Sequence, residues 1–297
     1  MIINQSTLQG LYIGFKTIFN KAFSGITPLY TKIATIVPSS TGAESYKWLG
    51  KVPRMREWIG ERVVQNLSNY EYTVKNKDFE LTIEVDRNDI EDDTIGIYNP
   101  LMASMGDSAA HHPDELVFGL LENGFNEKCY DGKTFFATNH KEGDSGVQSN
   151  RGTVKLSATS YGDARAKMMS LKDDTGKPLK VVPNLLVVPP QLEGEARKIL
   201  FADQIDGTTN IYKDSAELLV VPDLAGNATA WYLLDISKPV KPLIFQQRKK
   251  PQFVSMTKET DESVFNNKKY KYGVDSRDNA GFGLWQLAYG SDGTAAN

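Results

Sequence analysis

The chain is poor in the side chains on which metal sites and covalent catalysis depend. Among its 297 residues there is one cysteine, Cys129, and three histidines, His111, His112 and His140. A single cysteine excludes an internal disulfide and fits folding in a reducing compartment. No His-Glu-x-x-His or paired Cys-x-x-Cys motif is present, and the spacing from Cys129 to His140 matches no standard ligand pattern. The sequence therefore predicts no metal and no cofactor, with His140 as a hydrogen-bonding residue of a loop.

Long apolar runs and a strong net charge are also missing. The most apolar run, Leu185–Val188, stops at Pro189 and Pro190, far short of the roughly 20 residues needed to span a membrane. Lys16 and Lys21 interrupt the N-terminal segment, so we interpret it as mature sequence and not as a signal peptide. The 34 basic and 37 acidic side chains give a net charge of −3. This balance argues against a surface that binds nucleic acid everywhere.

The most informative segment of the chain is residues 46–93. Apolar and polar residues alternate over 70–74 and 79–85, with turn-forming residues 75–78 between them, which predicts a long two-stranded arm. A lone hairpin cannot bury an apolar face, so the arm must lie on its own domain or on another subunit. Tryptophan, tyrosine and arginine anchor protein interfaces. We therefore expect inter-subunit contacts from Trp48, Arg54, Arg56, Trp58, Tyr70 and Tyr72.

Two segments have the periodicity of helices. Apolar residues recur at steps of three and four over residues 8–23, which predicts an amphipathic helix that packs on its own subunit or docks on a neighbour. Residues 100–124 predict a second, longer helix with Asn99 as its N-cap. Pro113 predicts a break in this helix, and Asp114 favours a new helical start after the break.

The remainder of the chain alternates between helical and strand-like patterns. Residues 141–152 are rich in glycine, serine and asparagine, which predicts a flexible loop and a boundary. Helices are then expected at 161–171 and 193–199, with strands at 185–188, 216–221, 230–235, 243–247, 253–256 and 270–275. We expect the tail from Gly290 onward to be disordered.

Five segments, in this order along the chain, resemble the Mu-like phage major head subunit family. Each segment is weak evidence alone, but their common order over nearly the whole chain is specific. They are Trp48-Leu49-Gly50 followed by Arg54, Arg56, Glu57 and Trp58; residues 89–93; residues 112–117; residues 131–136 continuing to Asn139-His140; and residues 277–289. The resemblance implies an α+β chain with the tailed-phage major capsid fold of the Hong Kong ninety-seven type.

The resemblance also implies a division of the chain and a function. The implied parts are an N-terminal arm (1–45), an extended β-hairpin loop (46–93), a peripheral domain with a spine helix (94–152), an axial α/β domain (153–241) and C-terminal strands that return to the peripheral domain (242–297). Copies of the chain would form hexamers and pentamers of an icosahedral virion shell around double-stranded DNA. Assembly would take place in the host cytoplasm, without a membrane, with a scaffolding protein, a maturation protease and a portal as partners.

Other functions stay open at this point. A hydrolase or metal-dependent enzyme would use Cys129, Asp131 and His140, which lie near one another in the sequence. The acidic residues Asp89, Glu91, Asp92 and Asp93 would bind a cation, form a solvated hinge or pair with arginine of a neighbouring subunit. The basic residues Arg248, Lys249 and Lys250 would either face packaged DNA, whose phosphates attract cations, or lie in a solvated loop or an inter-subunit ion pair.

Overall fold

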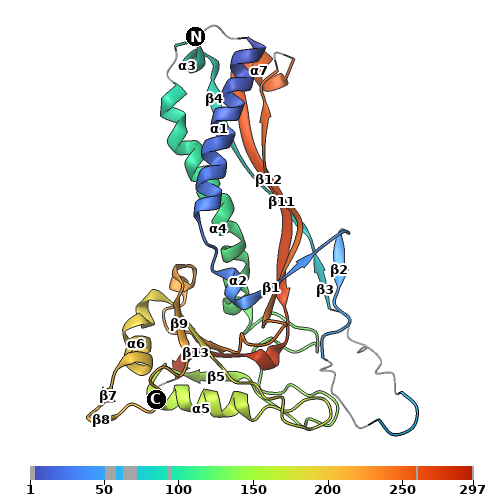
Figure 1. Ribbon diagram of the computed structural model, residues 1–297, viewed down its shortest axis with the longest axis vertical. Coiled ribbons are helices and arrows are strands. Elements are labelled where there is room, and N and C mark those ends of the chain that lie inside the picture. The colour runs from blue at the N-terminus through green and yellow to red at the C-terminus, as the bar shows by residue number, and fades with distance from the viewer. Residues whose placement is uncertain (1–3, 51–57, 63–71, 93–94, 259, 296–297) are drawn as a thin grey trace.

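The protein has a long upper part and a broader lower part in the computed structural model (Figure 1). The structure describes residues 4–50, 58–62, 72–92, 95–258 and 260–295. Two long helices, α1 (Gln5–Gly25) and α4 (Asn99–Asn123), lie side by side in the upper part. No helix of the described residues is long and apolar enough to cross a bilayer. The two described chain ends lie at opposite ends of the long axis (Figure 1).

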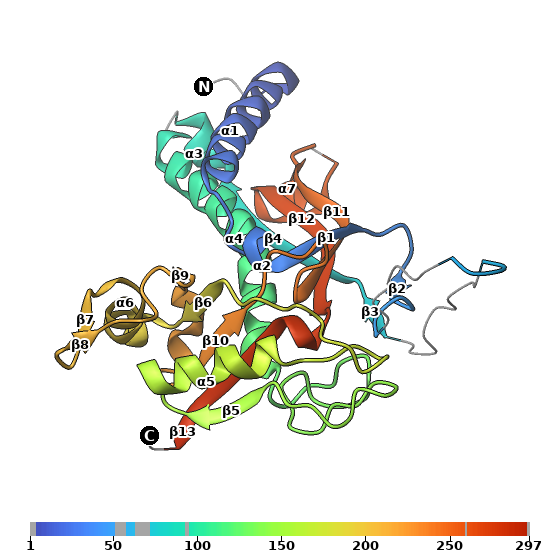
Figure 2. The same cartoon turned by 60° about the horizontal axis from the view of Figure 1, so that its bottom comes forward.

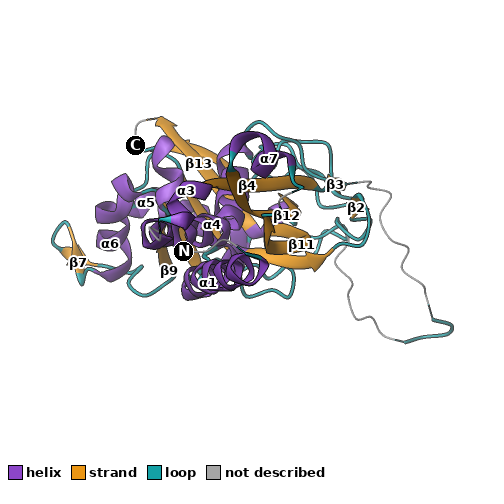
Figure 3. Ribbon diagram, turned by 90° about the horizontal axis from the view of Figure 1, so that it is seen from above, coloured by secondary structure: helices purple, strands orange, loops and turns teal. Residues whose placement is uncertain are grey.

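A four-stranded sheet runs along the upper part beside these helices. Its order is β1-β11-β12-β4, with β1 parallel to β11 and the other pairs antiparallel. Seen from above, the sheet and the two helices form separate layers (Figure 3). Tyr272 of the sheet contacts Phe15 of α1 edge to face at 5.0 Å, so the sheet is covered on this side. The strands are β1 (Ala34–Pro38), β4 (Lys77–Asp86), β11 (Leu243–Met256) and β12 (Lys269–Phe282).

The opposite face of this sheet carries a row of charged side chains along β12 and β4. Because side chains alternate between the two faces of a strand, the odd-numbered residues of β12, which alternate with the buried Tyr270 and Tyr272, point away from the helices. They form ion pairs with the neighbouring strand β4, which are Lys269–Asp86 at 2.9 Å, Lys271–Glu84 at 3.3 Å and Arg277–Asp78 at 3.4 Å. No helix of the described chain covers this face (Figure 3).

A five-stranded sheet forms the centre of the lower part, in the order β5-β13-β10-β6-β9. One face packs on α5 (Ala158–Met169) and α6 (Glu193–Phe201), through a core that includes Trp231 and Tyr161. The other face packs on the end of α4 and the loop after it, through Phe136 and Tyr232. The strands are β5 (Arg151–Val154), β6 (Leu185–Val188), β9 (Glu217–Val220), β10 (Trp231–Leu234) and β13 (Ala288–Ala295).

The remaining elements are short. The strand β2 pairs with β3, and β7 pairs with β8. The α-helices are α2 (Tyr30–Ile33), α3 (Arg87–Glu91) and α7 (Glu262–Asn267). The 3₁₀ turns are η1 (Ile95–Tyr98), η2 (Pro190–Leu192), η3 (Pro222–Gly226) and η4 (Trp285–Leu287). The short strands are β2 (Ala43–Ser45), β3 (Thr73–Lys75), β7 (Gln204–Ile205) and β8 (Thr208–Thr209).

The structure confirms the mixed α+β class and both long helices, but the predicted break in α4 is wrong. The helix runs through Pro113 without interruption, because buried residues on both sides, such as Ala110 and Val117, hold it to the core. Asp114 starts no second helix; its carboxylate instead accepts hydrogen bonds from the N-terminus of α2. Asn99 is the first residue of α4 and not its N-cap.

The predicted pairing of the two-stranded arm is also wrong. The segments with alternating polarity do form strands, but β3 pairs with β2 and β4 pairs with β12. Asn76, between β3 and β4, is buried and donates to Ser39 Oγ at 2.8 Å, while its carbonyl oxygen accepts from Gln246 at 2.7 Å. These bonds hold the chain against the body at the point where a free hairpin would turn.

Two predicted mobile regions are ordered. The tail from Gly290 to Ala295 is part of β13, which lies between β5 and β10 in the sheet. The predicted flexible loop at 141–152 buries Glu142, Ser145 and Asn150. Its polar residues bond inward instead of into solvent, which composition alone does not reveal.

Candidate functional site

The chain between β2 and β3 holds all six residues predicted to contact another subunit. Trp48 is half-buried against its own core and meets Tyr46 edge to face at 6.1 Å. The hydroxyl of Tyr72 accepts a hydrogen bond from the backbone N–H of Phe282 at 2.8 Å. Burial raises the pKa of Tyr72 to about 12, so this hydroxyl stays protonated. Both side chains therefore fix the base of the segment to the body, while Arg54, Arg56 and Tyr70 lie outside the described residues.

Residues 58–62 differ from this base because they stand clear of the body (Figures 1 and 3). Trp58 is 67% exposed and Ile59 is 72% exposed. The indole N–H of Trp58 donates to the carbonyl of Gly60 at 2.8 Å, and the Arg62 guanidinium lies 4.6 Å from the ring centre. The segment thus presents two large apolar side chains to solvent, and a cation–π contact supports one of them.

The basic residues Arg248, Lys249 and Lys250 lie within β11, at the point where its pairing with β12 is irregular, and not in the solvated loop that was one alternative expectation. Arg248 and Lys250 are exposed. Lys249 forms an ion pair with Asp275 of β12 in its own chain. Two of the three cations are therefore available to an external partner.

The acidic run 89–93 is engaged within its own chain. The carboxylate of Asp89 accepts a hydrogen bond from the Tyr98 hydroxyl. Glu91 accepts from Arg87 at 3.0 Å across one turn of α3. These contacts hold the N-terminal approach to α4 together, and Asp93 lies outside the described residues.

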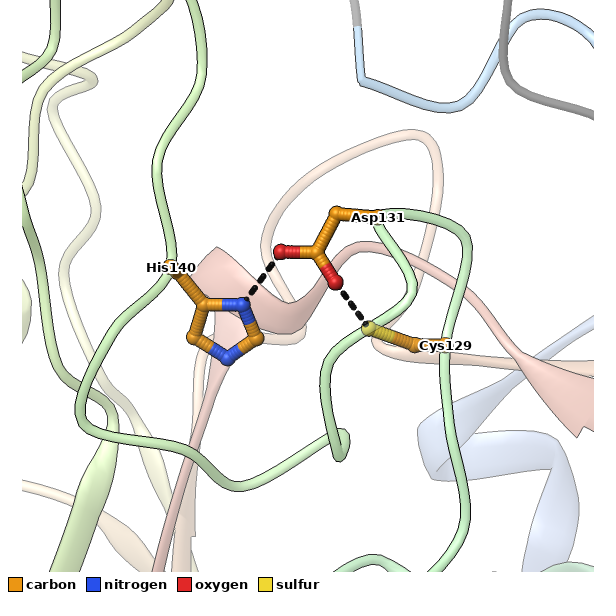
Figure 4. A group of neighbouring side chains, drawn as sticks. All are labelled: Cys129, Asp131 and His140. Carbon is orange, nitrogen blue, oxygen red and sulfur yellow. Dashed lines mark hydrogen bonds and ion pairs between the residues drawn. The ribbon is translucent and has the colours of Figure 1, made fainter.

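The predicted catalytic alternative involves Cys129, Asp131 and His140, which the structure does bring together. Figure 4 shows the Asp131 carboxylate between the other two side chains. One carboxylate oxygen lies 2.6 Å from His140 Nδ1, and the other accepts from the Cys129 thiol at 3.2 Å. The imidazole stacks on the Trp285 ring with the ring centres 4.0 Å apart. All three side chains are almost completely buried.

The electrostatics of this cluster do not favour a nucleophile. Burial, together with the nearby Asp131 charge, raises the pKa of the Cys129 thiol far above its ordinary value. Burial alone would raise the pKa of Asp131, but the hydrogen bond and charge of His140 outweigh it and lower that pKa. A protonated, buried thiol is unreactive because the thiolate is the nucleophilic form.

Sequence spacing did not reveal the residue that completes this cluster, Asn150. Its side-chain amide donates to the backbone carbonyls of Phe135, Trp285 and Ala288, and its oxygen accepts from the Ala137 N–H at 2.9 Å. Asn150 thus joins residues 135–137 of its own loop to the distant segment 285–288. The only signal in the sequence was a polar residue just before a strand, which is common in loops.

Comparisons with known proteins agree on one family. The family model described as Mu-like prophage major head subunit gpT matches residues 8–154, 150–224 and 223–297. The chain is 33% identical over 297 residues to the Mu-like prophage FluMu major head subunit of Haemophilus influenzae, with 99% of this chain and 77% of that protein covered. It is also 33% identical over 288 residues to the major capsid protein of Escherichia phage Mu, with 97% and 74% covered.

Solved structures give the same result for the fold. A chain of the bacteriophage JBD30 procapsid is 38% identical, with a TM-score of 0.63, and the match covers 97% of this chain and 76% of that chain. In the JBD30 capsid decorated with minor capsid protein trimers the identity is 30% and the TM-score 0.58, with 66% and 90% covered. A virus-like particle from Pyrococcus furiosus matches at 9% identity and a TM-score of 0.54, with 93% and 96% covered. This last likeness shows that the capsid fold extends beyond detectable sequence similarity.

Proposed function

The chain belongs to the Mu-like prophage major head subunit family and is the major capsid protein of a phage icosahedral capsid, and from this premise we propose that its shell is built from hexamers and pentamers joined by the segment 46–93. In this proposal, Trp58 and Ile59 dock on a second copy of the chain. The residues at the base of the segment, Trp48 and Tyr72, hold it to its own subunit so that its outer end reaches the neighbour.

The exposure of Trp58 and Ile59 carries this proposal. Fully burying a large apolar side chain is worth about 1.5–3 kcal/mol, and both are more than two-thirds exposed on a segment that stands clear of the body. One such contact is modest, but every subunit of a closed shell makes it with a neighbour, and the gains multiply over the lattice. The other members of the predicted set, Arg54, Arg56 and Tyr70, are proposed to contribute to the same contact.

The parts of the chain take distinct roles in this proposal. Residues 153–241 form an axial domain that gathers at capsomer centres, and α4 with the four-stranded sheet forms the peripheral domain. The strand β13, expected among the C-terminal strands of the peripheral domain, lies instead between β5 and β10 in the five-stranded sheet, so we assign it to the axial domain. The N-terminal arm, residues 1–45, packs through α1 on its own α4, so its contribution to a neighbour is the outer face that carries Ile13, which is 55% exposed. The extended segment then lies across the next subunit.

Further partners follow from a role in a phage head. We propose that a scaffolding protein, a maturation protease and a portal act on this chain during assembly in the host cytoplasm. The decorated JBD30 capsid supports a minor capsid protein as an outer partner. Double-stranded DNA would meet the inside of the shell without sequence specificity, with Arg248 and Lys250 as the exposed cations that touch it and Lys249 retained by Asp275.

Polar substitution at the end of the segment tests the assembly proposal. We expect the double variant Trp58→Ser/Ile59→Ser to remain folded, with an unchanged urea midpoint, but to form few or no shells by negative-stain microscopy and sedimentation velocity. Val147→Ser is the matched control, because Val147 is 71% exposed on a loop outside the segment, and it should assemble normally. Shells in normal yield from the double variant would show that the segment does not join subunits.

A further inference from the structure

We propose that Cys129, Asp131 and His140 form a zinc-binding site, in addition to the role of the chain in the shell. The three side chains come from the loop that follows α4, and Figure 4 shows the Asp131 carboxylate between His140 and Cys129, with one oxygen facing each. One ligand atom from each lies within 4.8 Å of the other two. Thiolate, imidazole and carboxylate together are the ligand types that zinc uses, whereas calcium and magnesium prefer oxygen alone.

Small shifts of the side chains would bring the three ligand atoms to the spacing of a tetrahedral site, since they already lie within 4.8 Å of one another. Zinc lies about 2.3 Å from sulfur and about 2.0 Å from nitrogen or oxygen, which separates neighbouring ligand atoms by roughly 3.5 Å. The Cys129 Sγ to Asp131 Oδ1 distance is already 3.2 Å. The Asp131 Oδ2 to His140 Nδ1 distance of 2.6 Å would open by roughly half an ångström or more. The fourth ligand would be a water molecule or the second oxygen of Asp131.

The orientation of His140 is fixed in the way that metal-bound histidines require. Its Nε2 faces two acceptors, the Phe135 carbonyl at 3.3 Å and Asn150 Oδ1 at 3.2 Å. The Asn150 oxygen is identified as such because it also accepts from the Ala137 N–H. Nε2 must therefore carry a hydrogen, which leaves Nδ1 to bind the metal. A carbonyl that holds the second ring N–H is the usual outer-shell partner of a zinc-bound histidine.

The exchange of protons for zinc balances the charge. Without metal, one proton lies between His140 Nδ1 and Asp131, and a second lies on the Cys129 thiol that donates to the same carboxylate. Zinc would replace both protons and leave a thiolate, a carboxylate and a neutral imidazole as ligands. The buried cluster is then neutral before and after binding, which matters because an uncompensated buried charge is costly. Two protons leave to solvent for each ion bound.

The cluster is buried, but the turn that covers it lies at the surface. The cluster lies beneath the turn at residues 129–132, where Gly132 and the following Lys133 are exposed. The same loop packs against Trp285 and, through Asn150, against the carbonyl of Ala288 at the start of β13. Bound zinc would therefore tie the end of α4 to both the loop and the five-stranded sheet.

Zinc content of the purified full-length chain tests the site directly. We expect the reduced, unassembled subunit to retain one zinc per chain after incubation with zinc chloride and desalting, measured by inductively coupled plasma mass spectrometry. Cys129→Ser should weaken binding by at least the roughly 10–100-fold that loss of an outer-shell partner costs. His111→Gln, which alters a half-exposed histidine of α4 outside the cluster, should bind as the unaltered chain does.

Two measurements on the unaltered chain test the proposed zinc site even if the Cys129→Ser variant does not fold. Cobalt(II) should give the visible absorption of a tetrahedral ion and a thiolate-to-metal charge-transfer band. Calorimetric titration with zinc in buffers of different ionisation enthalpy should report about two protons released per ion, as the exchange above requires. No retained zinc, a cobalt spectrum without a thiolate band, or undiminished binding in the Cys129→Ser variant would each overturn the proposal without affecting the role of the chain in the shell.

Discussion

The carboxylate of Asp114, in the middle of α4, accepts a 2.6 Å hydrogen bond from the backbone N–H of Tyr30, at the start of α2. Its second oxygen accepts from the N–H of Leu29 at 3.1 Å. The free N–H groups at a helix N-terminus need such partners, and a carboxylate also suits the positive end of the helix. This contact fixes the chain that follows α1 to the long helix.

Removing this carboxylate should destabilise the subunit. Hydrogen bonds to charged groups contribute about 1.5–3 kcal/mol each, and Asp114→Ala would leave two backbone donors without their partner, one of them buried. We expect a loss of about 2–3 kcal/mol in the free energy of unfolding, measured by urea denaturation of the unassembled subunit. Asp107→Ala, on the exposed side of the same helix, should change it by no more than about 0.5 kcal/mol. Equal losses in both variants would contradict this role for Asp114.

The same contact shows what the sequence reveals about the fold and what it does not. Periodicity gave the ranges of α1 and α4 closely, because a helix shows in its apolar stripe which face is buried. It also indicated that residues 79–85 form a strand. The pattern of apolar residues does not show which element a helix or strand packs against, however. The pairing of β4 with β12 was therefore missed. A new helical start after Pro113 was predicted for the same reason, since the buried contacts that keep the chain helical across Pro113 are tertiary.

For the candidate sites, too, residue type indicated some features, while others depend on tertiary contacts. Residue type alone indicated that Trp58 would be exposed and reach outward, because a large aromatic residue beside arginine is typical of an interface. In contrast, Trp48 has the same character but packs on its own core. The cluster of Cys129, Asp131 and His140 depends on a loop closed by Asn150 and Trp285. No fixed spacing encodes such a closure.

A second prediction concerns the contact between α1 and α4. A methyl group added at Gly106 of α4 would lie 2.5 Å from the backbone carbonyl of Phe19, which is too short for any relaxed structure. Gly106→Ala should therefore push the two helices apart and destabilise the subunit by about 1–3 kcal/mol, as overpacking does. The measurement is again the urea midpoint, with the helix contact followed by hydrogen exchange in α1.

Gly119→Ala is the matched control for this substitution. Gly119 lies in the same helix, and nothing lies within 4 Å of the added methyl group. Because alanine is the better helix former, this variant should be more stable by up to about 1 kcal/mol. If Gly106→Ala were also stabilising, the close approach of α1 to α4 would not exist in solution.

The proposed contact with DNA predicts a salt-dependent effect of two cations. Arg248→Glu/Lys250→Glu should reduce retention of the subunit on double-stranded DNA cellulose, and the difference should disappear as salt rises, because phosphate binding releases counterions. Lys155→Glu/Lys172→Glu is the control: it changes the net charge by the same amount at exposed positions elsewhere. Equal loss of retention in both variants would assign the effect to net charge and not to the basic run of β11.

The final prediction follows from acidic groups near the end of α4. Burial and the nearby charge of Asp223 raise the pKa of Glu122 above its ordinary value of 4.5. Burial likewise raises the pKa of Asp114, against the effect of its two backbone hydrogen bonds, and Asp223 adds to the rise. A carboxyl whose pKa is higher in the folded state binds its proton more tightly there. Its contribution to stability therefore increases as the pH falls through the folded pKa and levels off below the unfolded value.

Asp223→Asn should weaken this dependence. Without the Asp223 charge, the pKa of Glu122 moves back toward 4.5, so the gain in stability on acidification from neutral pH toward 4.5 becomes smaller. At neutral pH the variant should be slightly more stable, by a few tenths of a kcal/mol, since the repulsion between partly solvated charges is weak. Urea midpoints at a series of pH values measure both effects. Asp144→Asn alters an exposed position on another loop and should leave the pH dependence of the urea midpoint unchanged. If Asp223→Asn also left it unchanged, Asp223 would not act on Glu122.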